Sequence, residues 1–118
     1  MLPHAVAAIV IALGASAASE SPPIEKAHCP PASANCESAT GRVIYVEATD
    51  PDGDGDAHLV LSSDEAITGP GISVVDVMRD LRPHPLPRLG DLVSAAGPVY
   101  RGSYGQRQIE ADVIRVAP

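Results

Sequence analysis

The sequence predicts an all-β domain, a five-stranded Greek-key barrel with a short helical, proline-rich segment between the third and fourth strands. Segments of β-branched and alternating apolar residues recur along the chain. Glycines and prolines mark the bends between them, and only one brief segment has helical character. The five predicted strands cover residues 42–48, 57–62, 72–77, 91–101 and 107–116.

The N-terminal region is expected to direct export. The chain has 118 residues, which suits one domain, and residues 5–13 form an apolar run followed by small side chains at 14–19. The alternative is a buried N-terminal helix, since no Lys or Arg precedes the run. We expect residues 1–18 to be a signal peptide, 19–40 an irregular Pro/Ser/Ala-rich segment and 41–116 the domain. The protein is then secreted or periplasmic, with no membrane span in the mature chain.

Cys29 and Cys36 are the only cysteines, and in an exported protein we expect them to form a disulfide. The closed loop is short, so its contribution to the free energy of unfolding is only about 2.5 kcal/mol. A zinc site that adds His28 and His58 is the alternative, but the spacing matches no familiar zinc pattern.

The first two strands enclose an acidic loop. Residues 42–48 are apolar on both faces, as expected for a strand that two sides of a closed barrel share. In 57–62 the residues alternate between two faces. One face carries Ala57, Leu59 and Leu61, and the other carries His58, Val60 and Ser62.

The remaining elements follow from local signals. Residues 76–82 can form a helical turn capped by Asp76, after which three prolines favour an extended connection. Gly97-Pro98 predicts a bulge or sharp bend in the fourth strand. In the fifth strand, Ile109, Ala111 and Val113 should face inward.

Four segments resemble the OB-fold (nucleic-acid-binding-type) domains of small exported bacterial proteins. They are GRVIYVE, DGDAHLVL, LGDLVSAAGPVY and GQRQIEAD, and the resemblance covers about residues 41–116. It implies a five-stranded barrel whose first and fourth inter-strand loops flank the binding face. It does not identify the ligand, because this fold carries many unrelated functions.

The loop after the first strand matches the opening of a calcium-binding loop, D-x-D-x-D-G. Carboxylates at alternate positions converge on one hard cation. The twelfth position, however, is Leu61 rather than Glu, so the loop is not an EF-hand. A looser calcium site, with a Kd of about 10⁻⁴–10⁻³ M, and a plain polar turn both remain open. The candidate metal ligands are Asp50, Asp52, Asp54 and Asp56.

The loop between the fourth and fifth strands combines rings and guanidinium groups, which are the ingredients of single-strand or sugar recognition. The candidate ligand-binding residues are Tyr100, Arg101, Tyr104 and Arg107. We expect this loop and the acidic loop to border one cleft. Alternatively, the two loops only neutralise each other through exposed ion pairs.

Charge argues against a nucleic-acid partner. The formal net charge is −7, with −9 in residues 19–78 and +2 in 79–118, whereas nucleic-acid binders usually carry a basic footprint. No Ser-His-Asp spacing or nucleophile elbow is present, so we expect no enzymatic activity. The sequence therefore predicts an exported OB-fold domain that binds a protein or polar molecule. The alternatives are a calcium-binding structural or adhesion module and a binder of single-stranded nucleic acid.

Overall fold

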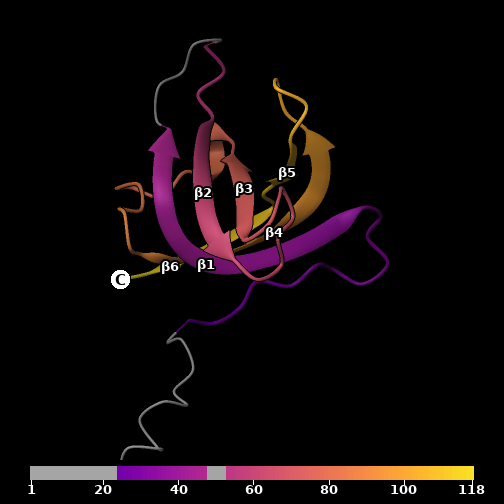
Figure 1. Cartoon of the computed structure of the whole chain (residues 1–118), viewed down its shortest axis with the longest axis horizontal. Coiled ribbons are helices and arrows are strands. Elements are labelled where there is room, and N and C mark those ends of the chain that lie inside the picture. Colours follow the sequence, from indigo (N-terminus) through magenta and orange to yellow (C-terminus); the bar gives the residue numbers. More distant parts are fainter. Residues whose placement is uncertain (1–23, 48–52) are drawn as a thin grey trace, which may run out of the picture.

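The computed structural model describes residues 24–47 and 53–118, in which six strands form one mixed sheet that nearly closes into a ring (Figure 1). Within the described part, the only helical element between strands is a 3-10 turn at Arg79–Leu81, after β3. The strands are β1 (Cys36–Glu47), β2 (Ala57–Ser63), β3 (Ile72–Val77), β4 (Leu92–Arg101), β5 (Arg107–Glu110) and β6 (Val113–Ala117). The domain is therefore all-β, as predicted.

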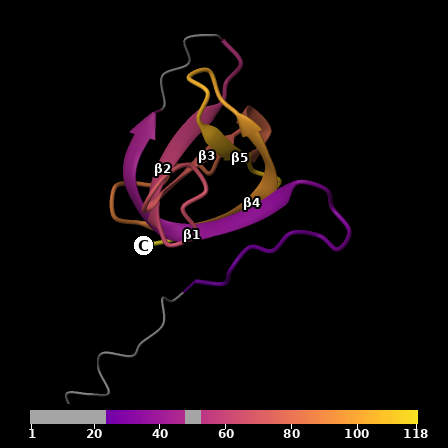
Figure 2. The ribbon, with the colours of Figure 1, turned by 45° about the vertical axis from the view of Figure 1, so that its right-hand side comes forward.

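Strand β1 is long and bent, and it belongs to two sides of the ring (Figure 2). Its first half pairs with β4, from Cys36↔Pro98 onward, and its second half pairs with β2. Gly41 takes part in both ladders, and a Cβ atom at this position would lie 1.9 Å from the carbonyl oxygen of Ser62. Only glycine permits so close an approach.

The prediction of a single fifth strand is wrong, because residues 107–116 contribute two strands. Val99 pairs with Ile109 but Ala96 pairs with Val113, so the register against β4 shifts by one residue between β5 and β6. At this break the amide of Ala111 donates 3.0 Å to the carbonyl oxygen of Asp76 on β3. The backbone at Ala111 thus bonds to β3 instead of β4, and the ladder with β4 is interrupted at this point.

A bulge or sharp bend was predicted at Gly97-Pro98, and the irregularity in pairing there lies on the facing β5–β6 segment, which has one residue more than β4. β4 runs unbroken from Leu92 to Arg101. Gly97 has a different role there, because a Cβ atom at this position would lie 2.0 Å from the carbonyl oxygen of Glu110. The glycine therefore lets the irregular end of β5 pack against β4.

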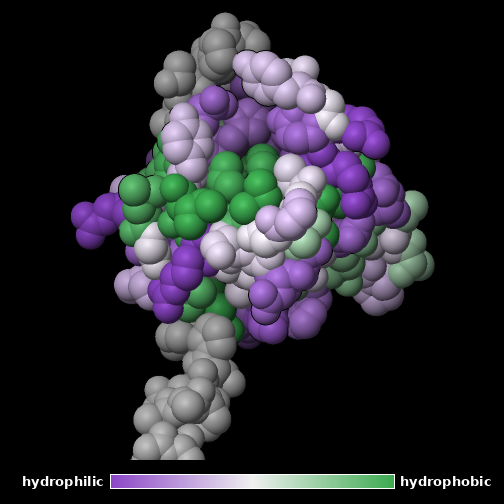
Figure 3. Space-filling model, in the orientation of Figure 1, coloured by the Kyte–Doolittle hydropathy of each residue, from purple (hydrophilic) through white to green (hydrophobic). Residues whose placement is uncertain are grey.

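The core lies on one face of the curved sheet. Alternation along β2 is as predicted: Ala57, Leu59 and Leu61 are fully buried, while His58 and Val60 are only partly buried. Aliphatic side chains from β1, β3, β4 and the β5–β6 break complete the main cluster, which consists of Val43, Leu59, Leu61, Val75, Val77, Val93, Ala95 and Ala111. Hydrophobic residues also gather on one side of the molecule, over β1, β2 and β3, with hydrophilic residues above and below them (Figure 3).

Described residues before position 41 contribute to the sheet. β1 begins at Cys36, and the disulfide between Cys29 and Cys36 is present, as predicted. Ala27 is buried, and its amide donates 2.8 Å to Oγ of Ser94 on β4. Among the described residues no helix is long and apolar enough to cross a membrane. The predicted signal peptide lies outside the described residues.

The helical turn predicted over residues 76–82 is also shorter than expected. Asp76 is a residue of β3, where it pairs with His58 of β2, so it caps no helix. The 3-10 turn begins after Met78 without a side-chain cap. Long-range strand pairing therefore overrides the local capping signal.

Candidate functional site

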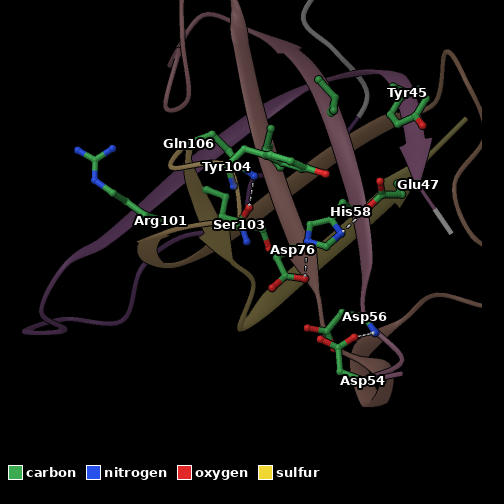
Figure 4. Close-up of a pocket in the computed structure, with 14 residues that line it drawn as sticks. Tyr45, Glu47, Asp54, Asp56, His58, Asp76, Arg101, Ser103, Tyr104 and Gln106 are labelled. Carbon is green, nitrogen blue, oxygen red and sulfur yellow. Dashed lines mark hydrogen bonds and ion pairs between the residues drawn. The ribbon is translucent and has the colours of Figure 1, made fainter. Parts of the chain in front are cut away.

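A pocket of about 760 Å³ lies on the face of β2 and β3 opposite to the core, between the β1–β2 and β4–β5 loops (Figure 4). Alternation places His58 and Val60 of β2, and Val74 and Asp76 of β3, toward it. The lining residues are Tyr45, Glu47, Asp54, Asp56, His58, Val60, Val74, Asp76, Arg101, Gly102, Ser103, Tyr104, Gln106 and Gln108. The two loops singled out in the sequence thus border one cavity.

The floor of the pocket contains a histidine between two carboxylates. Glu47, His58 and Asp76 lie directly opposite one another on β1, β2 and β3. Nδ1 of His58 is 3.2 Å from the Glu47 carboxylate, and Nε2 is 3.5 Å from Oδ1 of Asp76. Neither contact has hydrogen-bond geometry, so Nδ1 of His58 and Oδ1 of Asp76 are buried without a hydrogen-bond partner. The attraction between these groups is therefore electrostatic and depends on the protonation of the imidazole.

The carboxyl group of Asp76 titrates unusually. Its burial raises its pKa from the ordinary value of 3.8 to about 6, although the charge of nearby His58 acts in the opposite direction. The charge of Asp56, a hydrogen bond with the Asp56 side chain and the charge of Glu110 raise the pKa further. The Asp76 side chain is only 13% exposed. This group thus changes charge close to physiological pH.

The acidic loop contributes part of the rim. The amide of Asp56 donates 2.8 Å to Oδ1 of Asp54, which is a local turn stabilised by an aspartate side chain. Both residues line the pocket, whereas Asp50 and Asp52 lie outside the described residues. Within the ranges that the structure covers, no three His, Cys, Asp or Glu residues are arranged to hold a metal ion. Calcium binding by this loop stays a prediction.

The zinc alternative is excluded in its predicted form. It required the thiolates of Cys29 and Cys36, and these two sulfur atoms are bonded to each other.

The β4–β5 loop forms the opposite rim, and two of its four predicted ligand-binding residues line the pocket. Arg101 and Tyr104 line the pocket, but Tyr100 and Arg107 do not. Nη2 of Arg107 lies 2.8 Å from the carboxylate of Glu37 on β1, so this guanidinium group is engaged elsewhere. Nη1 of Arg101 donates 2.7 Å to the carbonyl oxygen of Gly105. In Figure 4 the Arg101 side chain points away from the histidine and its carboxylates.

Two glutamines and two tyrosines complete the cavity. The amide of Tyr104 donates 2.9 Å to Oε1 of Gln106, and Nε2 of Gln106 donates 3.2 Å to Oε1 of Gln108. This chain of contacts holds the loop over β5. The Tyr104 side chain is 94% exposed, and Tyr45, on the β1 side, is 57% exposed. Sequence reasoning missed Tyr45 and Asp76 as pocket residues, because it predicted each strand separately and not which strands pair or in which register.

The pocket as a whole is acidic. Four carboxylates line it, against one guanidinium group that is directed away. Chemically, the cavity combines a charged floor, a neutral amide wall and a rim of two phenol rings.

Comparison with known proteins adds no family: no family model matches the chain, and no curated protein matches it.

Proposed function

We propose that the protein is an exported, non-enzymatic OB-fold domain that binds a polar molecule or protein segment in this pocket. The OB-fold assignment is supported by the order of pairing, which runs β1–β2–β3–β5–β4 and returns from β4 to β1. β6 continues the direction of β5 along β4 after a register shift of one residue. A fold of this type uses the first and fourth loops as the borders of its binding face.

The observation that carries the proposal is the position of the pocket. It lies between the β1–β2 and β4–β5 loops, and its volume of about 760 Å³ falls in the ordinary range for small-molecule sites. The acidic lining disfavours a polyanion, because carboxylates repel phosphate groups. A protein segment or small polar molecule is therefore the better candidate than a nucleic acid.

The proposal is tested by filling the pocket without changing its charge. Val60 faces the cavity from β2, so Val60→Trp should occupy part of it. Ser62, the next outward-facing residue of the same strand, is exposed and does not line the pocket, so Ser62→Trp is the matched control.

The measurement is nuclear magnetic resonance of the ¹⁵N-labelled chain with a panel of defined probes. The panel contains amino acids, amines, monosaccharides, nucleotides and short peptides. We expect at least one probe to give saturable shifts at pocket amides, lost in Val60→Trp and kept in Ser62→Trp. If no probe gives saturable shifts, or if the shifts survive in Val60→Trp, the pocket is not the binding site.

A further inference from the structure

We propose that the pocket binds an organic cation, the protonated amine or guanidinium group of its ligand. This inference rests on the proposed binding function and specifies its ligand class. It is carried by three features of the cavity: its charge, its exposed rings and a buried carboxylate oxygen without a hydrogen bond.

The first feature is the charge balance. Carboxylates approach the cavity from three separate elements: Glu47 from β1, Asp54 and Asp56 from the β1–β2 loop, and Asp76 from β3. Arg101 is the one guanidinium group in the lining, and its Nη1 is hydrogen-bonded to the carbonyl oxygen of Gly105 in its own loop. The other side chain of the lining that can carry positive charge is His58, a single group between Glu47 and Asp76. A positive ligand group would therefore meet an excess of negative charge on more than one side.

The second feature is the pair of phenol rings. Tyr104 is 94% exposed and Tyr45 is 57% exposed, although both line the pocket. They stand on opposite walls, one on the β4–β5 loop and one on β1 (Figure 4). Aromatic faces attract ammonium and guanidinium groups, modestly at exposed sites and more strongly where water is excluded. Exposed rings beside carboxylates thus form a suitable surround for an organic cation.

The third feature is a buried acceptor. Oδ1 of Asp76 is buried without a hydrogen-bond partner, and Asp76 lines the cavity. Its contact with Nε2 of His58, at 3.5 Å, is not a hydrogen bond, so a ligand donor that reached this carboxylate would add a hydrogen bond that the protein by itself lacks. Ammonium and guanidinium groups carry only donors, so they match this need, whereas anions do not.

A metal ion fits these observations less well than an organic cation. Within the described residues, no three ligating side chains converge as a metal centre requires. Two tyrosine rings add nothing to a calcium or magnesium shell, which is built of closely spaced oxygen atoms. A larger and more diffuse cation uses both the rings and the separated carboxylates.

The test compares matched probes on the purified full chain by calorimetry and chemical-shift mapping. N-acetyl-lysinamide and N-acetyl-argininamide are the cationic probes, and N-acetyl-norleucinamide and N-acetyl-glutaminamide are neutral counterparts of similar length. We expect the cationic probes to bind at least tenfold more tightly, and raised salt to weaken them. Equal binding of the neutral probes would overturn the inference.

Variants then locate the cation. Glu47→Gln and Tyr104→Ala should each weaken the cationic probes about three- to tenfold, while Asp64→Asn, an exposed carboxylate outside the pocket, should not. Unchanged affinity in both pocket variants would refute the assignment. Comparing N-acetyl-lysinamide with tetralysine then shows whether the natural ligand is a small amine or a basic polypeptide. Similar affinity per lysine indicates a small amine, and much tighter binding of the peptide indicates a basic polypeptide.

Failure of this inference is distinguishable from failure of the proposed function. If a neutral or anionic probe binds and Val60→Trp abolishes that binding, the pocket is a binding site but not one for cations. If cations bind equally well to Val60→Trp, they bind outside the pocket, and both proposals fail.

Discussion

Replacing Asp76 by asparagine should stabilise the domain at neutral pH and have progressively less effect as the pH falls. The pKa of this carboxyl group is about 6 in the folded protein, against an ordinary value of 3.8. The folded state therefore binds the proton more tightly than the unfolded state, so its stability falls as pH rises between these two values. The difference corresponds to at most about 3 kcal/mol in the free energy of unfolding.

Asparagine resembles the neutral carboxyl group in shape and cannot ionise. Relative to the wild type, Asp76→Asn should therefore gain up to about 3 kcal/mol between pH 4 and pH 8. Urea unfolding of both proteins, followed by circular dichroism at five pH values across this range, gives the difference directly. For a domain of this size, each kcal/mol corresponds to about 4–8 °C in Tm, so thermal unfolding provides a second reading.

The control is Asp64→Asn, which removes an exposed carboxylate outside the pocket and should change little with pH. The reasoning would be refuted if the difference between Asp76→Asn and the wild type were constant, or fell, from pH 4 to pH 8. That result would mean that the contact with His58 at 3.5 Å compensates for the burial of the charge.

Two further predictions concern the scaffold. Gly97→Ala should lower the free energy of unfolding by about 3 kcal/mol or more, because the new Cβ atom would lie 2.0 Å from the backbone oxygen of Glu110. The control in urea unfolding is Gly69→Ala, whose Cβ atom would have its nearest neighbour 3.9 Å away. Equal losses of stability in the two variants would contradict the packing argument. Removing the disulfide through Cys29→Ser with Cys36→Ser should cost about 2.5 kcal/mol for its short loop. A reducing agent should destabilise the wild type equally and leave the double variant unchanged, and an undiminished Tm after reduction would disprove that contribution.

Local sequence signals were sufficient for the individual strands. β2 and β3 match their predicted ranges closely, because alternation along an extended chain is a property of neighbouring residues. The pairing of Cys29 with Cys36 needed only a cysteine count and an expected oxidising compartment. That the two loops lie close together followed from the resemblance, which places the first and fourth inter-strand loops beside the binding face.

Other predictions failed where distant segments compete for the same residues. The cap expected at Asp76 was lost to a strand ladder with His58, and the single strand 107–116 was divided because Ala111 bonds to β3. Ligand binding by Arg107 stays a prediction, and its guanidinium group pairs with Glu37, which is 70 residues away along the chain. Strand alternation contains no information about such partners.

The sequence by itself determined the all-β class, the inward and outward residues of β2, and the acidic and Arg/Tyr loops. Only the tertiary structure decided that Glu47, His58 and Asp76 form one row across three strands, with Tyr45 on the rim above them. The reason is that register between strands depends on where each chain segment bends and bulges, at Gly41, Val43–Tyr45 and Ala111. A shift of one residue in either ladder would turn His58 away from its carboxylates and remove the pocket floor.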